Sequence, residues 1–273
     1  MVNLRVNLAC GNVYVERSDW INLDYAPSNP AVKQADLLAK LPFKDEKFDV
    51  VYSSHFIEHI PKSQVVGFLR ECFRILAPGG LIRLVLPDFE EMCREYLLRR
   101  GSGEHEKADF LVVEIIDQCV RLRPGGELLD TYRRIAKNSE KHADMVEYIR
   151  FRTGETLGFD RVDNSVSAAR NIGNKPSSLS RFITNIVKLH EKVSRRVQRV
   201  WFNWLIGRLP SAFHMQNVSF ATVGERHHWL WDFHQLTNVL IECGYADIKR
   251  CQAATSRITD FPFFPLDLDE RGQ

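Results

Sequence analysis

Strand-like and helix-like segments alternate over roughly the first ninety residues, and this alternation constrains the fold more than any other feature. Apolar segments typical of strands occur at 4–9, 19–23, 48–53 and 81–86. Residues 62–76 instead repeat apolar side chains at helical spacing, and Pro78-Gly79-Gly80 interrupts that pattern. Strands that alternate with helices form parallel sheets covered by helices, so the sequence predicts an α/β fold with helices on both faces.

The sequence pattern changes after the strand expected at 81–86, which is the fifth when a strand that ends at Asp36 is counted. Charge-rich amphipathic segments follow Phe89, and they predict a large, mostly helical insertion. The α/β pattern returns at Asp232, which is expected to cap a helix that ends at Gly244, and a further strand is expected at 248–252. The predicted organisation is a core formed by 1–90 and 225–256, an insertion at 91–224 and a tail at 257–273.

Composition narrows the functional class. A net charge of +2 predicts no general attraction to nucleic acid. The six cysteines never form a C-x-x-C pair, which argues against a disulfide scaffold or a zinc ribbon. The start of the chain lacks the pattern of a signal peptide, and no segment has the length of a transmembrane helix, so the expected location is the cytoplasm.

Four of the expected loops carry residues suited to a nucleoside ligand. In open parallel sheets, ligands bind beyond the carboxyl ends of the strands. A glycine there lets a ligand approach the backbone, and an acid can accept hydrogen bonds from both hydroxyls of a ribose. The full G-x-G-x-x-G cradle for a pyrophosphate is missing, which argues against a dinucleotide. The four groups are Ala9-Cys10-Gly11, Asp24, Asp36-Leu37 and Ser53-Ser54-His55.

These groups lie within a set of motifs that resembles a known family. The set comprises VNLACG at 6–11, WINLD at 20–24, ADLL at 35–38, LPF at 41–43, FDVVYSSH at 48–55, EH at 58–59 and RILAPGG at 74–80. Together they resemble the class I (Rossmann-like) S-adenosylmethionine-dependent methyltransferases, most closely the methyltransferase-11 type. The resemblance covers about residues 3–90 and returns at 224–252.

The resemblance implies S-adenosyl-L-methionine as the cofactor and gives each loop a role. The backbone of Ala9, Cys10 and Gly11 would border the methionine half. Asp24, followed by Tyr25, would bind the ribose. Asp36 would bind the adenine amino group and the Leu37 backbone a ring nitrogen. Ser53, Ser54 and His55 would line the methionine and sulfonium side.

Two parts of the chain depart from the family pattern. Only about a dozen residues separate Gly11 from Asp24, so the usual first helix is expected to be very short or replaced by a loop. The tail shows no clear final strand, because prolines interrupt residues 259–265. Two alternatives are therefore expected: the final strand is truncated in this sequence, or the edge of the sheet is completed differently.

Two histidines are candidate catalytic bases. Methyl transfer needs positioning, and a base when the acceptor is a hydroxyl. His227 matches a histidine that recurs in this subfamily, and His55 follows the fourth strand. His59 is expected to bond backbone. No metal site is predicted, because the spacing of His227, His228 and His234 matches no standard set of ligands.

A basic amphipathic segment at 181–208 has two interpretations. It can form a lid helix that packs on the insertion, with a solvated basic face. It can also lie on an anionic membrane surface with its tryptophans at the interface, which would make the protein peripheral. The basic pattern alone does not decide, and we favour the lid helix.

The sequence therefore predicts methyl transfer, with the insertion forming the acceptor pocket. The expected acceptor is an oxygen of a sugar, a glycan or a glycolipid intermediate, because relatives of this type often occur near glycan-biosynthesis genes. A small metabolite is the alternative substrate. A scaffold subunit that binds the cofactor without its own chemistry is the non-enzymatic alternative.

Overall fold

The computed structural model describes two compact units, formed by Met1–Val120 with Thr222–Gln273 and by Arg121–Ala221. The residues described in detail are 4–157, 201–202, 204–205, 208–210, 219, 224–252 and 255–267. The helix expected at 181–208 lies almost entirely outside these residues, so neither interpretation of it is tested.

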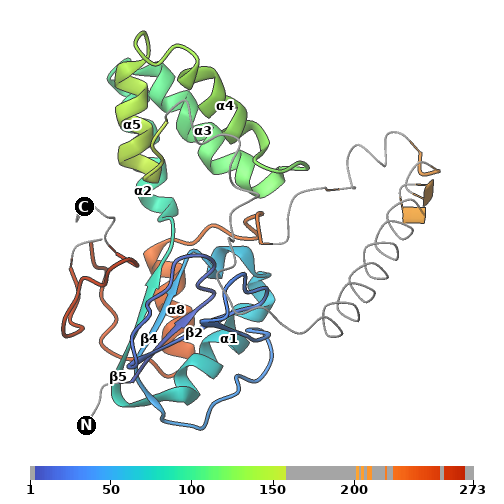
Figure 1. Ribbon diagram of the computed structural model, residues 1–273. Coiled ribbons are helices and arrows are strands. Elements are labelled where there is room, and N and C mark those ends of the chain that lie inside the picture. Colours follow the sequence, from blue (N-terminus) through green and yellow to red (C-terminus); the bar gives the residue numbers. More distant parts are fainter. Residues whose placement is uncertain are drawn as a thin grey trace, which may run out of the picture. The chain divides into compact units, whose positions relative to one another are not determined.

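The first unit contains a five-stranded parallel sheet in the order β3-β2-β1-β4-β5 (Figure 1). Its strands are β1 (Arg5–Leu8), β2 (Trp20–Asp24), β3 (Val32–Gln34), β4 (Phe48–Ser54) and β5 (Leu76–Val85). The direction of chain progression reverses between β1 and β4, where Val6 pairs with Val51. This order confirms the predicted α/β, Rossmann-like class and places the ligand crevice at the carboxyl ends of β1 and β4.

Two helices, α1 (Lys62–Ile75) and α8 (Phe233–Glu242), contribute to the main core on one face of the sheet (Figure 1). Val65, Leu69 and Cys72 of α1 are fully buried, as expected from their helical spacing. Asp232 accepts a hydrogen bond from the Gln235 backbone N–H, which confirms the predicted cap of α8.

The Pro78-Gly79-Gly80 sequence lies inside β5, where the prediction placed a break before a strand at 81–86. Helix α1 ends at Ile75, and β5 begins with the next residue, Leu76, which pairs with Phe48. The pairing then jumps to Leu81 opposite Val50, so the intervening residues form an irregularity in the strand. Gly79, at φ 77°, adopts the left-handed conformation that such a bulge favours.

The other face of the sheet is covered by the C-terminal segment in the part of the chain that the structure describes. Ile258 and Phe263 are buried against Trp20 and Tyr52, and the rings of Trp20 and Phe263 lie 5.0 Å apart, edge to face. Residues 11–19, between β1 and β2, form turns, as the short spacing predicted. The tail thus covers apolar surface on the sheet face opposite α1 and α8.

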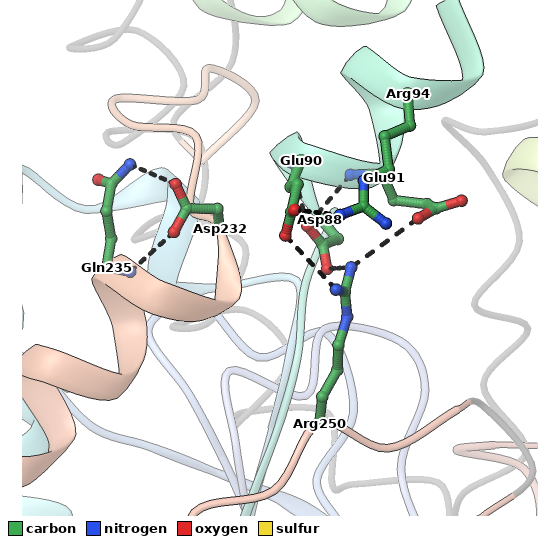
Figure 2. Close-up of polar contacts among 7 residues, drawn as sticks. All are labelled: Asp88, Glu90, Glu91, Arg94, Asp232, Gln235 and Arg250. Atoms are coloured by element: carbon green, nitrogen blue, oxygen red, sulfur yellow. Dashed lines mark hydrogen bonds and ion pairs between the residues drawn. The ribbon is translucent and has the colours of Figure 1, made fainter. Parts of the chain in front are cut away.

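The strand predicted at 248–252 does not form. This segment and β5 line a cavity of about 430 Å³, and Arg83, Val85 and Ile248 are among its lining residues. Arg250 forms ion pairs with Asp88 and Glu90 at the start of α2 (Phe89–Gly101) (Figure 2). The segment is therefore held by side chains, and no backbone ladder joins it to the sheet.

The described part of the predicted insertion is largely helical. Helices α2 and α3 (His105–Val120) pack together in the first unit, and the second unit contains α4 (Gly126–Ala136) and α5 (Ala143–Thr153). Among the described helices, none combines the length and apolar character required to cross a bilayer.

Candidate functional site

The carboxyl ends of β1 and β2 meet through the Asp24 side chain. Asp24 Oδ2 accepts a hydrogen bond of 2.8 Å from the Gly11 backbone N–H, and Oδ1 accepts one of 2.9 Å from Ala26. Two backbone donors thus fix this half-buried carboxylate beside the first loop. We call Ala9, Cys10, Gly11 and Asp24 the β1–β2 end of the site.

The backbone of the first loop is unusual. Ala9 and Gly11 have φ angles of 58° and 54°, in the left-handed region. For Ala9 this conformation costs about 1 kcal/mol or more, and such residues concentrate at ligand sites. Apart from Gly11 itself and its two chain neighbours, no described residue has an atom within 4 Å of the position that a Gly11 Cβ would occupy, so the exposed backbone faces open space. A ligand can therefore approach the chain closely at this point.

Cys10 is buried and is not a nucleophile. Burial, and then the negative charge of Asp24, raises the pKa of the Cys10 thiol to about 12. The thiol therefore stays protonated at neutral pH, and a protonated thiol is a poor nucleophile.

The residues after β3 differ in burial, because one is exposed to solvent and the next lies in the core. Asp36 is exposed, and its Oδ1 accepts a hydrogen bond from the Leu38 backbone N–H at 3.0 Å. Leu37 is buried in the main core, so its side chain is not available to a ligand. The Tyr25 side chain is 61% exposed, which leaves the ring free to cover a ligand beside Asp24.

At the end of β4, Ser53 is buried, Ser54 is half-buried and the His55 side chain is 63% exposed. His55 has a φ of 49°, and its backbone N–H donates to the Val85 carbonyl at 2.8 Å. Leu8 pairs with Ser53, so Ala9 and His55 follow neighbouring strands. The two predicted groups, after β1 and after β4, therefore lie at the same edge of the sheet.

Glu58, in the short helix η1 (Ile57–His59), organises the histidines that follow β4. Its side chain is 1% exposed, and Oε1 lies 3.2 Å from His55 Nδ1. The hydrogen bond to Glu58 raises the pKa of His55. No sequence motif predicted this role of Glu58, although its position three residues after His55 allows contact across one helical turn.

His227 lies beside His59, close to the end of β4, but it is buried. Its residue exposure is 6%, and its ring centroid lies 4.6 Å from that of His59. Its backbone N–H donates to the Gln118 carbonyl at 2.9 Å. His59 Nδ1 lies 3.0 Å from the Arg226 carbonyl, a backbone contact of the kind that was expected for His59. We call His55, Glu58, His59 and His227 the β4 end of the site.

Comparison with known proteins identifies one domain. Residues 16–84 match the family model described as a methyltransferase domain. This match includes Asp24, Asp36, His55 and Glu58. No curated protein matches the sequence.

Solved structures with partial likeness include methyltransferases from three organisms. An S-adenosylmethionine-dependent methyltransferase from Mesorhizobium loti is 23% identical, with a TM-score of 0.25, over 30% of this chain and 47% of that chain. One from Archaeoglobus fulgidus is 21% identical, with a TM-score of 0.26, over 35% and 51%. One from Methanococcus maripaludis is 18% identical, with a TM-score of 0.25, over 42% and 69%. The chain thus spans about half the length of the first solved structures it matches.

The domain match agrees with the sheet order and with the loops at the carboxyl ends of β1 and β2. It confirms the predicted resemblance and implies S-adenosylmethionine as the cofactor of this domain. Over residues 16–84 the chain is therefore similar to the methyltransferase domain family of the methyltransferase-11 type.

Proposed function

We propose that the chain is an enzyme that transfers a methyl group from S-adenosylmethionine to an oxygen of a sugar, a glycan or a glycolipid intermediate. The observation that carries the proposal is the contact between Gly11 and Asp24, which joins a glycine loop after β1 to an acid after β2. This arrangement fits a nucleoside whose ribose hydroxyls donate to a carboxylate.

The residues at the β1–β2 end fit such a ligand in other respects. The Gly11 backbone is exposed to open space, and Asp24 is accessible enough to accept further hydrogen bonds. A carboxylate has room for about four hydrogen bonds, of which the described residues supply two to Asp24. Asp36 and Tyr25 are exposed on the following loops, and their exposure supports a role for them in holding the nucleoside.

His55 is the residue of the β4 end best placed to remove a proton from an acceptor hydroxyl. A carboxylate only accepts hydrogen bonds, so the hydrogen between His55 and Glu58 resides on His55 Nδ1. In the neutral ring this leaves Nε2 free to take a proton. Glu58 then stabilises the imidazolium that forms, which makes His55 the stronger base.

Burial favours His55 over His227 as the base. The His55 side chain is 63% exposed, whereas His227 is covered and packs against His59. S-adenosylmethionine supplies an electrophilic methyl group when bound. The chain contributes positioning at both ends of the site and a base at His55.

The sugar or glycan acceptor rests on the type of relative that the sequence resembles. An exposed base that suits hydroxyl acceptors supports it. Incubation of the protein with methyl-labelled S-adenosylmethionine and a host extract tests the proposal. We expect label in a carbohydrate-containing product, at an oxygen. Label in a small metabolite would show that the acceptor is a metabolite and not a carbohydrate. Absence of any labelled product would favour a scaffold subunit that has lost its chemistry.

A further inference from the structure

We propose that Glu58, His59 and His227 form a binding site for a divalent transition-metal ion, with zinc as the reference ion. Among the described residues, these three side chains place one ligand atom each within 4.8 Å of the others. No local pattern predicts this set, because His59 and His227 are far apart in the sequence. The proposed base His55 also contacts Glu58, but binding of the ion does not require S-adenosylmethionine.

The hydrogen bond of His59 leaves the correct nitrogen available. Nδ1 lies 3.0 Å from the Arg226 carbonyl oxygen, which only accepts, so Nδ1 carries the hydrogen. In the neutral ring, Nε2 is then unprotonated, and its lone pair can coordinate a metal ion. Histidines that bind metals commonly fix their other nitrogen on a carbonyl in this way.

That nitrogen faces a carboxylate. His59 Nε2 lies 4.0 Å from Glu58 Oε1, so two electron-rich atoms face each other with no hydrogen between them when His59 is neutral. A cation between the two residues would remove this unfavourable arrangement.

The second carboxylate oxygen of Glu58, Oε2, also favours a bound ion. Glu58 is 1% exposed, and its Oε1 faces His55 and His59. Oε2 is buried and has no hydrogen-bond partner among the described residues. Leaving a buried carboxylate oxygen without a partner is costly, whereas a metal ion would satisfy it.

The local backbone holds the cluster together. The Glu58 carbonyl accepts hydrogen bonds from the His228 and Trp229 backbone N–H groups, at 2.6 and 3.3 Å. The Gln118 carbonyl accepts a hydrogen bond from the His227 backbone N–H. η1 and residues 227–229 are thus fixed to each other before any ion binds, so binding needs only side-chain adjustment.

The chemistry of the set favours zinc. Two histidines and one glutamate are a known set of zinc ligands that leaves one coordination position open. Tetrahedral zinc with bonds of about 2.0–2.2 Å holds its ligand atoms about 3.3–3.5 Å apart, so the side chains would draw together by about 1 Å. His55, which bonds Oε1, would then orient the metal-binding carboxylate.

Zinc calorimetry on the full chain, after removal of metal with a chelator, tests the proposal. We expect one zinc ion per chain, and a loss of affinity of at least about tenfold in each of Glu58→Gln, His59→Gln and His227→Gln. His228→Gln is the matched control, because His228 is adjacent, exposed and outside the cluster, and its affinity should equal that of the wild type. Circular dichroism verifies that each variant is folded.

Cobalt absorption of the wild-type protein provides a second measurement that needs no variant. Nitrogen and oxygen ligands give visible bands without the near-ultraviolet charge-transfer band of thiolates, and this is the expected spectrum. No zinc binding, thiolate-type cobalt absorption, or equal affinities in His227→Gln and His228→Gln would each overturn the proposal. None of these outcomes depends on cofactor binding, so the proposed function is tested separately.

Discussion

The β1–β2 end and the β4 end each place a carboxylate near the same edge of the sheet, but in opposite environments. Asp24 is half-buried and is held by two backbone N–H groups. Glu58 is buried and is surrounded by three histidines. The first carboxylate is accessible to a ligand, whereas the second acts on its neighbours. A substitution at the β1–β2 end should therefore alter binding, and one at the β4 end should alter chemistry or stability.

The largest expected effect lies at the β4 end, in His55→Ala. If His55 removes the proton of the acceptor, its loss should lower the methyl-transfer rate by about 10²–10⁴-fold. Affinity for S-adenosylhomocysteine should fall much less than the rate, because the β1–β2 end, which would hold the nucleoside, is intact. Turnover and calorimetry on the same preparation separate the two quantities. A fully active His55→Ala protein would show that positioning alone suffices.

At the β1–β2 end, Asp24→Ala should weaken binding of S-adenosylhomocysteine by roughly 1.5–3 kcal/mol, the range for hydrogen bonds to a charged group. Thermal stability without ligand should change little, since the side chain is not part of the core. Calorimetry gives the first quantity and thermal unfolding the second. Unchanged affinity in a folded Asp24→Ala protein would remove this residue from the site.

His227→Ala distinguishes the sequence-based hypothesis from the structural one. As a catalytic base, His227 would affect turnover alone. Its burial beside His59 instead predicts a loss of about 1–2 kcal/mol in the free energy of unfolding, typical of a buried substitution. Denaturant unfolding of metal-free protein measures this loss. Wild-type stability combined with a hundredfold slower reaction would restore His227 as the base.

The smallest effect concerns Asp232, which caps α8 just after the His227 segment. Its hydrogen bond from the Gln235 backbone N–H lowers its pKa in the folded protein. Its contribution to stability is therefore complete above the ordinary pKa of an aspartate and is lost as the pH falls through the lower, folded value. Asp232→Ala should cost about 0.5–1 kcal/mol near neutral pH and less in acid. Unfolding curves across this pH range measure the cost of the substitution. A cost that does not vary with pH would contradict this account.

Local patterns predicted much of the fold. Apolar runs located β1, β2 and β4 within one residue or so, and helical spacing located α1. The strand predicted at 248–252 failed because its pattern has no backbone partner in the fold, and Arg250 is instead held by Asp88. The start of β5 was missed because Pro78-Gly79-Gly80 also marks a turn between elements.

The residues of the candidate site also differ in whether local sequence patterns could predict them. Asp24, Asp36 and His55 follow strands, so position along the chain was enough to predict that they share an edge. The roles of Glu58 and His59 depend on contacts with residues near 227, which no local pattern reveals. The sequence could therefore identify the accessible carboxylate but not the buried one.

Calorimetric comparison of S-adenosylhomocysteine with NAD on the wild-type chain tests the central claim most directly. The Asp24 carboxylate, the open backbone at Gly11 and the missing pyrophosphate cradle predict binding of S-adenosylhomocysteine and no measurable binding of NAD. Binding of NAD without binding of S-adenosylhomocysteine would contradict the account.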